Sequence, residues 1–370
     1  MAATPLTVFL CGDVMLGRGV DQILPYPGAP EVREPYVADA RGYVRLAETA
    51  NGPIDVPVDF SWPWGDALAV LAETTPDVRV VNLETSVTSS DDFMSNKLVH
   101  YRMNPANLPS LSVAHPDVCA LANNHVLDFD RRGLAETLDA LAHASLRTVG
   151  AGFDADQARR PAIVPTGAGT RVVVFSFGMA SSGIPAQWAA TEERAGVDFV
   201  SAPSPAAATE IVERVERVKQ PGDVVIASVH WGDNWGYTVT PEQTDFAHAL
   251  IEGGVDIVHG HSSHHPRPVE LYRNGLILYG CGDFINDYEG IVGHEQYRDE
   301  LRLLYLVSVE PGLAAPTEVR LVPMRARRMR LGHAGHEDTR WLQSTLDRIS
   351  RDFGSRVGMT PDGALTVRRV

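Results

Sequence analysis

The sequence predicts an α/β fold in which strands and helices alternate along the chain. Short apolar runs rich in β-branched residues recur at lengths typical of buried strands, and segments of helical periodicity lie between them. Nearly every apolar run also ends in a cluster of Asp, Glu, Asn or His. In an α/β sheet, ligands bind beyond the carboxyl ends of the strands, so the second pattern agrees with the first.

The predicted strands, in chain order, cover residues 6–11, 78–81, 118–122, 171–177, 223–229, 256–258 and 276–279. Helices are predicted over residues 134–141 and 211–218, where leucine, isoleucine or valine recurs every three or four residues. A further helix begins after Thr240, because Thr240 is a good N-cap and Gln243 stands where its capping-box partner should be.

Residues 22–64 differ from the rest, because they contain many prolines and no long periodic run. They predict a long loop or subdomain inserted after the first strand, either a functional lid or a surface insertion without a role. After residue 300, closing strands are predicted over 301–309 and 318–323 and a helix over 339–353, so residues 311–370 form a closing strand and helix. The chain shows no internal repeat, and all 370 residues (1–370) are predicted to form one domain.

Composition narrows the possible partners. The chain has 32 Lys and Arg against 47 Asp and Glu, a net charge of −15, which argues against nucleic acid and against anionic membranes. The three cysteines form no pairing motif, which excludes a disulfide scaffold. The first residues show no signal-peptide pattern and no span long enough for a bilayer, so we expect a cytoplasmic protein.

The polar clusters at the strand ends predict one metal site. Any single cluster has an ordinary explanation, since an Asp after a strand can cap a helix and a His can pack in a core. These ordinary explanations do not account for the recurrence of such clusters at six strand ends. Mixed imidazole and carboxylate donors suit a divalent cation. The clusters are Gly12-Asp13, Asn82-Leu83-Glu84, Asn123-Asn124-His125, His230-Trp231-Gly232-Asp233, His259 to His265, and Gly282-Asp283-Phe284.

In these motifs the chain resembles the CapA family of capsule and poly-γ-glutamate synthesis proteins, within the calcineurin-like metallophosphoesterase superfamily. The resemblance covers roughly residues 6–310, with every motif in order. It implies two central β-sheets packed face to face and flanked by helices, with a metal site at the carboxyl ends of the strands. The motifs are Gly12 to Arg18, Asn82 to Thr85, Ala122 to Asp128, Val229 to Gly232, Gly260 to His264 and Tyr279 to Phe284.

The resemblance also implies the site residues and a divalent metal, with Ca, Mn, Zn and Fe left open. His125 matches the superfamily histidine that assists the leaving group. The implied metal ligands are Asp13, Glu84, Asn124, His230, His261 and His264.

Three departures weaken the expectation of phosphatase chemistry. Met15 stands where metallophosphatases carry a second ligand, and Asn82-Leu83-Glu84 replaces their Gly-Asp motif. Two serines, Ser262 and Ser263, separate the last two histidines. Two-metal phosphoester hydrolysis needs both ions, so a full dinuclear centre is doubtful.

Acid/base chemistry on a peptide is therefore the preferred prediction. Epimerisation exchanges a Cα proton between two titratable groups on opposite faces of one carbon, and Asp13, His125, His230 and the loop residue His294 are the predicted catalytic groups. The family contains soluble members that epimerise the C-terminal residue of a lasso-peptide precursor, and the chain resembles them. The predicted activity is a metal-dependent peptide epimerase.

The predicted partner is a peptide substrate. Arg18 and Arg102 are candidates for its terminal carboxylate, against the alternative of ordinary salt bridges, and Trp231 for its side chain. Two other functions stay open: a metal-dependent hydrolase of a phosphoester or amide, and an accessory protein of poly-γ-glutamate or capsule synthesis.

Overall fold

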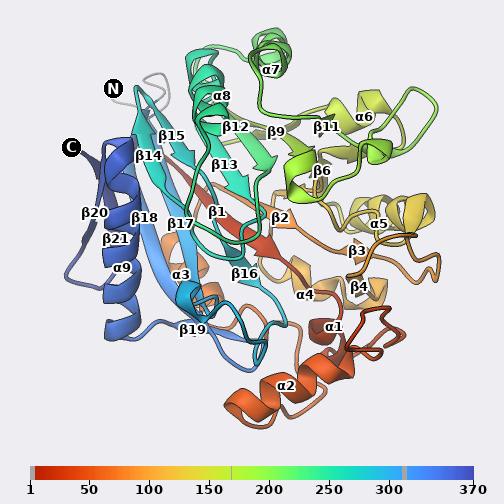
Figure 1. Ribbon diagram of the computed structural model, residues 1–370. Coiled ribbons are helices and arrows are strands. Elements are labelled where there is room, and N and C mark those ends of the chain that lie inside the picture. The colour runs from red at the N-terminus through yellow and green to blue at the C-terminus, as the bar shows by residue number, and fades with distance from the viewer. Residues whose placement is uncertain (1–4, 168, 311–314) are drawn as a thin grey trace.

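A computed structural model of the chain describes residues 5–167, 169–310 and 315–370. Two large mixed sheets lie against each other in the middle of the molecule (Figure 1). The first has the order β20-β21-β18-β17-β1-β2-β5-β6, with β16 beside β1 and β19 beside β18. The second has the order β11-β9-β12-β13-β15-β14, with β8 beside β9. The α/β architecture of two packed sheets flanked by helices is therefore confirmed.

Every predicted strand is present, and several are longer than expected. In the first sheet these are β1 (Leu6–Val14), β2 (Val78–Leu83), β5 (Val118–Ala120), β17 (Leu301–Glu310) and β18 (Ala315–Ala326). In the second sheet they are β9 (Arg171–Met179), β12 (Val224–His230), β13 (Ile257–His261) and β15 (Gly275–Leu278). The extensions matter for function, because they carry Asp13, His230 and His261 on the strands themselves.

The strands that the sequence analysis missed are mostly short edge or pairing segments. In the first sheet they are β6 (Arg147–Val149), β16 (Asp283–Ile285), β19 (Leu331–His333), β20 (Ser355–Met359) and β21 (Leu365–Arg369). In the second they are β8 (Ala162–Pro165), β11 (Phe199–Val200) and β14 (Val269–Tyr272). Two small ribbons pair β3 (Ser86–Val87) with β4 (Arg102–Met103), and β7 (Ala151–Gly152) with β10 (Gly196–Val197).

The core follows the period-two alternation of side chains along each strand. On β1, Val8 and Leu10 belong to the apolar cluster between the sheets, whereas Phe9 faces the helices on the outer side. On β12, Ile226 faces the inter-sheet core and Val225 faces α7 and α8. Both faces of both sheets are therefore covered, which holds the strand ends in fixed positions.

The predicted helices are α5 (Asp130–His143), α7 (Pro205–Val218), α8 (Pro241–Glu252) and α9 (His336–Ser350). Figure 1 shows α7 and α8 over the outer face of the second sheet and α9 beside β20 and β21. The capping box of α8 is confirmed, since the Thr240 side chain accepts from the Gln243 N–H and the Gln243 side chain accepts from the Thr240 N–H.

The structure adds regular elements to two segments for which the sequence analysis did not predict them. The proline-rich region 22–64 contains an amphipathic helix, α2 (Arg41–Asn51), which buries Tyr43 and Ala47. The C-terminal segment contains the hairpin β20–β21, which extends the first sheet through β18, in addition to the predicted strand and helix. Residues 311–314 of that segment lie outside the described residues. The other helices are short: α1 (Gly19–Ile23), α3 (Ala67–Thr74), α4 (Pro109–Ser112) and α6 (Ala155–Arg159).

Candidate metal centre

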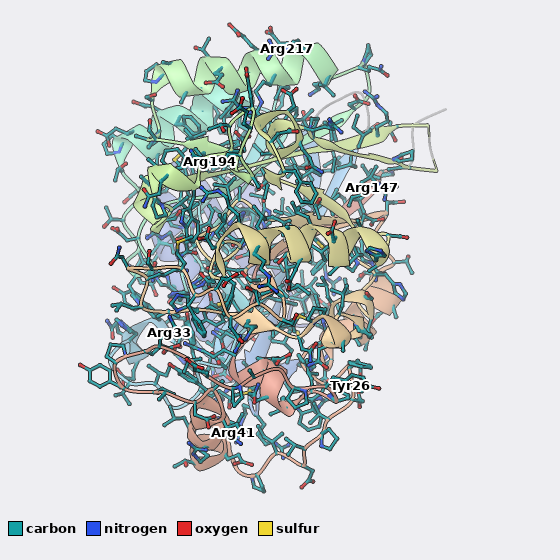
Figure 2. The ribbon with its side chains drawn as sticks, turned by 90° about the vertical axis from the view of Figure 1, so that its right-hand side faces the viewer. Tyr26, Arg33, Arg41, Arg147, Arg194 and Arg217 are labelled. Atoms are coloured by element: carbon teal, nitrogen blue, oxygen red, sulfur yellow. The ribbon has the colours of Figure 1, made fainter. Side chains whose placement is uncertain are left out.

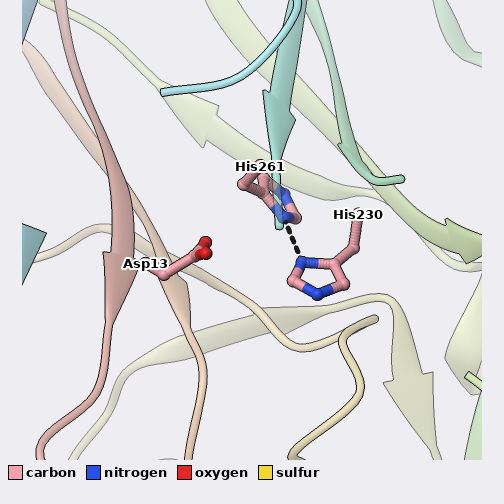
Figure 3. Close-up of side chains that lie close together, drawn as sticks. All are labelled: Asp13, His230 and His261. Atoms are coloured by element: carbon pink, nitrogen blue, oxygen red, sulfur yellow. Dashed lines mark hydrogen bonds between the residues drawn. The ribbon is translucent and has the colours of Figure 1, made fainter. Parts of the chain in front are cut away.

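Two rows of polar side chains meet where the sheets end. In the first sheet Asp13 on β1 lies in register with Asn82 on β2 and with Asp283 on β16. In the second sheet His230 on β12 lies in register with His261 on β13. Figure 3 shows the Asp13 carboxylate pointing toward the two imidazoles across the gap between the sheets.

The Asp13 carboxylate belongs to two groups of potential ligands. One consists of Asp13, His230 and His261, and the other of Asp13, His264 and Asp283. Within each group the donor atoms lie within 4.8 Å of one another, and all five side chains are buried. One carboxylate thus stands between two separate pairs of ligands, so the five side chains form a single centre.

Close approach of backbones makes this arrangement possible. A Cβ atom on Gly12 would lie 1.5 Å from the carbonyl oxygen of Gly282, so only glycine fits between β1 and the segment that leads to Asp283. Ser262 has a positive φ of 104°, and its N–H donates to Asp13 Oδ2 over 3.3 Å. Strained backbone of this kind persists where the surroundings hold it in place, and here it helps to orient the shared carboxylate.

The electrostatics of the centre fit a bound cation. Burial and the neighbouring Asp283 raise the pKa of Asp13 to about 7, and burial raises the pKa of Glu84 well above its usual range. Burial lowers the pKa of His230 and of His261. Neutral imidazoles bind metals, and a cation relieves the repulsion between buried carboxylates.

The contact between the two histidines supports the same conclusion. Nδ1 of His230 lies 2.7 Å from Nδ1 of His261, so in the neutral pair one of these nitrogens carries the proton between them. The other nitrogen of His261 lies 2.9 Å from the Ser228 hydroxyl, which orients the ring. Two nitrogens that converge on one proton can hold a cation in its place, and the donor set therefore fits a divalent metal.

Glu84 and Asn124, both predicted ligands, line the same centre. Glu84 Oε1 lies 3.8 Å from Nε2 of His230, and Asn124 Oδ1 lies 3.1 Å from the same nitrogen. Asn82, which the sequence analysis did not assign, donates to Asp13 Oδ1 over 2.7 Å and to Glu84 Oε2 over 3.2 Å. It therefore fixes the relative position of these two carboxylates.

His125 stands at the edge of the centre in a defined tautomer. Its Nδ1–H donates to Asp128 Oδ2 over 2.7 Å, and Lys97 pairs with the other oxygen of Asp128. Burial lowers the pKa of His125 to about 4, so the ring is neutral and its Nε2 carries a lone pair. Because Nε2 lies 3.9 Å from Glu84 Oε1, that lone pair faces the metal ligands.

His264 and His294 mark the side on which the centre opens. His264 Nδ1 donates to Asp283 Oδ1 over 2.9 Å. Burial lowers the pKa of His264, but Asp283 and Asp13 together raise it above its usual value. His294 is half-buried and stacks on Trp235, with 3.9 Å between ring centroids. Both histidines line a pocket of about 260 Å³.

The structure places the three predicted substrate-binding residues away from a free binding role. Trp231 is buried, and its indole N–H donates to the carbonyl of Tyr279. Arg18 pairs with Asp287 and Glu34. Arg102 pairs with Asp91 and donates to backbone carbonyls. Both arginines thus form salt bridges, as the alternative expected, but their side chains are buried and not at the surface.

Sequence reasoning missed Asp283 as a candidate ligand, although it recognised the strand-end cluster that contains it. The missing information was its partner, because only the pairing of β16 with β1 brings Asp283 beside Asp13. His259 on β13 belongs to a predicted strand-end cluster but to neither group of candidate ligands. It is fully buried, and its Nε2–H donates to the carbonyl of Cys11 over 2.7 Å, so it ties the two sheets together.

Comparison with known proteins decides the family. A family model described as "Bacterial capsule synthesis protein PGA_cap" matches residues 7–288. The chain belongs to this PGA_cap family. The match includes all the residues of the candidate centre, whereas β17, β18 and the C-terminal hairpin lie entirely beyond it.

Several curated proteins are similar to this member of the PGA_cap family. A protein of Mycobacterium tuberculosis named "Probable polyglutamine synthesis accessory protein" is 54% identical over 370 residues, covering 99% of this chain and 97% of the relative. The "PGA biosynthesis protein CapA" of Bacillus subtilis is 24% identical over 283 residues, covering 76% of this chain and 63% of the relative. Among solved structures, a 5'-nucleotidase precursor from Thermus thermophilus gives a TM-score of 0.47 at 14% identity, covering 86% of this chain and 54% of that one.

Within residues 5–167, 169–310 and 315–370, no helix is both long enough and apolar enough to cross a bilayer.

Proposed function

We propose that this protein is a metal-dependent hydrolase of amide bonds that serves the synthesis of a polyglutamine-type chain. The observation that carries the proposal is the shared Asp13 carboxylate, which links two buried pairs of ligands into one centre. The choice of substrate follows the printed name of the 54% identical relative. The proposal takes up the hydrolase and accessory-protein alternatives together, because the family and its named relatives favour them over epimerisation.

The chain's own residues supply the groups that such a reaction needs. Asp13, His230, His261, His264 and Asp283 would hold the metal. A divalent cation in such a site polarises a carbonyl group and makes bound water a better nucleophile.

Proton transfer is the role we assign to His125. Its Nε2 is unprotonated and faces the ligands, and Asp128 fixes the tautomer through Nδ1, so Nε2 can take up a proton and return it to a leaving amine. Lys97 pairs with Asp128 through the other carboxylate oxygen, and its Nζ also lies 3.0 Å from His125 Nδ1.

Peptide epimerisation is the competing chemistry, and the same groups could exchange a Cα proton. A single experiment separates the two. The purified protein, loaded with Mn²⁺ or Zn²⁺, is incubated in D₂O with an acetylated oligoglutamine, and the products are analysed by mass spectrometry with and without a chelator. Hydrolysis yields shorter chains, whereas epimerisation yields a full-length chain that carries deuterium.

The proposal expects shorter chains whose formation the chelator abolishes. His125→Ala should slow the reaction by about 10²- to 10⁴-fold, the range for loss of one general acid or base. His143→Ala is the matched control, since His143 is exposed on α5 and its ring hydrogen-bonds to the Asp139 carbonyl of the same helix. Deuterium uptake without cleavage would establish epimerisation instead. If neither deuterium uptake nor cleavage occurs, both chemistries are refuted.

A further inference from the structure

The centre opens into the pocket that His264 lines, and the chemistry of that pocket bears on the substrate. The wall is mainly aromatic and apolar: Trp235 and His294 form a stacked pair, and Tyr43, Tyr288 and Ile291 are further lining residues. Ile291 is 44% exposed at the same site, so the apolar surface continues from the pocket to the outside.

Arg18 is the one arginine among the lining residues, and its charge is already compensated. Its Nε and Nη2 donate to Asp287, and Nη1 donates to Glu34 over 2.9 Å. The guanidinium also lies 3.6 Å from the ring centroid of Tyr43 and 4.5 Å from that of Tyr101. Because Asp287 and Glu34 already occupy its donors and its side chain is only 2% exposed, Arg18 is not available for a bidentate contact with a further carboxylate.

Acidic groups surround the same space. Glu34 and Asp299 both line the pocket. Among the lining residues the carboxylates of Glu34 and Asp299 outnumber the one guanidinium, that of Arg18. An anionic side group would therefore meet net negative charge at the wall.

In Figure 2 the labelled arginines are spread from one end of that face to the other; they are Arg33, Arg41, Arg147, Arg194 and Arg217. The net charge of −15 by itself disfavours a polyanionic ligand.

We infer that the pocket beside the metal centre selects a polyamide chain with uncharged carboxamide side groups and excludes the same chain with carboxylate side groups. The inference rests on the proposed function and adds a specificity to it. Aromatic faces such as the Trp235–His294 pair suit planar amide and alkyl groups, and the Asp299 carboxylate offers oxygen acceptors for amide N–H donors. Both oxygens of Glu34 already accept, one from Arg18 and the other from the Tyr43 hydroxyl.

The test compares binding of two probes of equal length, an oligoglutamine and an oligoglutamate, each acetylated at one end and amidated at the other. Binding to the full chain is measured by calorimetry at moderate salt, with and without Mn²⁺. We expect the glutamine oligomer to bind at least about tenfold more tightly in both conditions, the size of a typical single-contact discrimination. Equal or tighter binding of the glutamate oligomer overturns the inference, as does failure of both probes to bind.

Variants identify the groups responsible. Glu34→Gln frees Arg18 from one of its two partners and should bring the affinities of the two oligomers together, and Asp299→Asn should act in the same direction. Glu31→Gln is the matched control, because Glu31 lies in the same loop but is 64% exposed and does not line the pocket. Thermal melting checks that each variant is folded. Unchanged selectivity in both folded variants also overturns the inference.

These measurements need no turnover, so the inference and the proposed function can fail separately. Selective binding without cleavage would refute the hydrolase and leave the specificity standing. Cleavage of both oligomers at equal rates, with equal affinities, would refute the specificity and leave the hydrolase standing.

Discussion

Replacing Asp13 by Asn should have opposite effects on the metal-bound and the metal-free protein. Asp13 is common to both groups of ligands, so its loss should weaken metal binding at both. A metal at about 100-fold above its Kd stabilises a protein by about 2.7 kcal/mol. With about 2.1 cal/mol/K of unfolding entropy per residue, a chain of 370 residues should lose roughly 3 to 4 °C of metal-induced Tm shift.

The metal-free variant should be more stable than the metal-free wild type above neutral pH. Burial and Asp283 raise the pKa of Asp13 to about 7 from 3.8, so the folded state binds more protons than the unfolded state between these values. Stability contributed by this group is therefore present below about pH 4 and is lost as the pH rises through 7. At 1.36 kcal/mol per pH unit the loss is on the order of 4 kcal/mol, and asparagine avoids it.

The loss of a hydrogen bond reduces the stability that the metal-free Asp13→Asn variant is expected to gain. An amide at position 13 can accept from Asn82 but turns a donor toward the Ser262 N–H, which loses one hydrogen bond of about 1 kcal/mol. The net expectation is about 3 kcal/mol in favour of the metal-free variant at pH 8.

The assay is urea unfolding of wild type and variant at pH 5 and pH 8, each with a chelator and with added Mn²⁺, together with metal content by mass spectrometry. The expected result is a variant that binds no metal, shows no metal-induced stabilisation and exceeds the chelated wild type in stability only at pH 8. A variant that retains the full metal content would refute the shared-ligand geometry. A chelated wild type that is equally stable at both pH values would refute the electrostatic reasoning.

Three further predictions concern the scaffold and are measured by denaturant unfolding. Gly12→Ala should destabilise the fold by more than about 4 kcal/mol, because its Cβ would collide with the Gly282 carbonyl, and a smaller loss would contradict that contact. Ser262→Gly should stabilise the metal-free protein by about 1 kcal/mol by relieving the positive φ, and unchanged stability would show that the backbone there is unstrained. Hydrogen bonds, first among them those from Arg356, hold the pKa of Asp347 below its usual range. Asp347→Asn should therefore lower the free energy of unfolding by about 2 kcal/mol at pH 7. This Asp347 contribution is present above about pH 4 and is lost as the pH falls through the lower folded pKa, so wild type and variant should converge in acid.

The candidate centre could be predicted largely from the sequence because its residues come at the ends of apolar runs. Parallel strands present their carboxyl ends at one edge, so Asp13, His230 and His261 had to lie near one another once the runs were recognised as strands. The same local logic predicted the capping box of α8, in which Thr240 and Gln243 are only three residues apart.

Long-range pairing could not be predicted in this way. The register of β16 with β1 makes Asp283 a candidate ligand by placing it beside Asp13. The Arg18 guanidinium pairs with Asp287, 269 residues away in the chain, and is therefore not free to bind a substrate. The helix α2 was missed because its proline-rich surroundings concealed an amphipathic stretch whose apolar face is buried only by tertiary contact.

The sequence by itself thus determined the fold class, the family motifs and the kinds of ligand at the strand ends, since these depend on local periodicity and residue chemistry. Only the tertiary structure decided which carboxylate is shared, which tautomer His125 adopts and which charges remain available at the pocket. Those properties depend on which distant groups are brought within a few ångströms of one another, and on the burial that then shifts their pKa values.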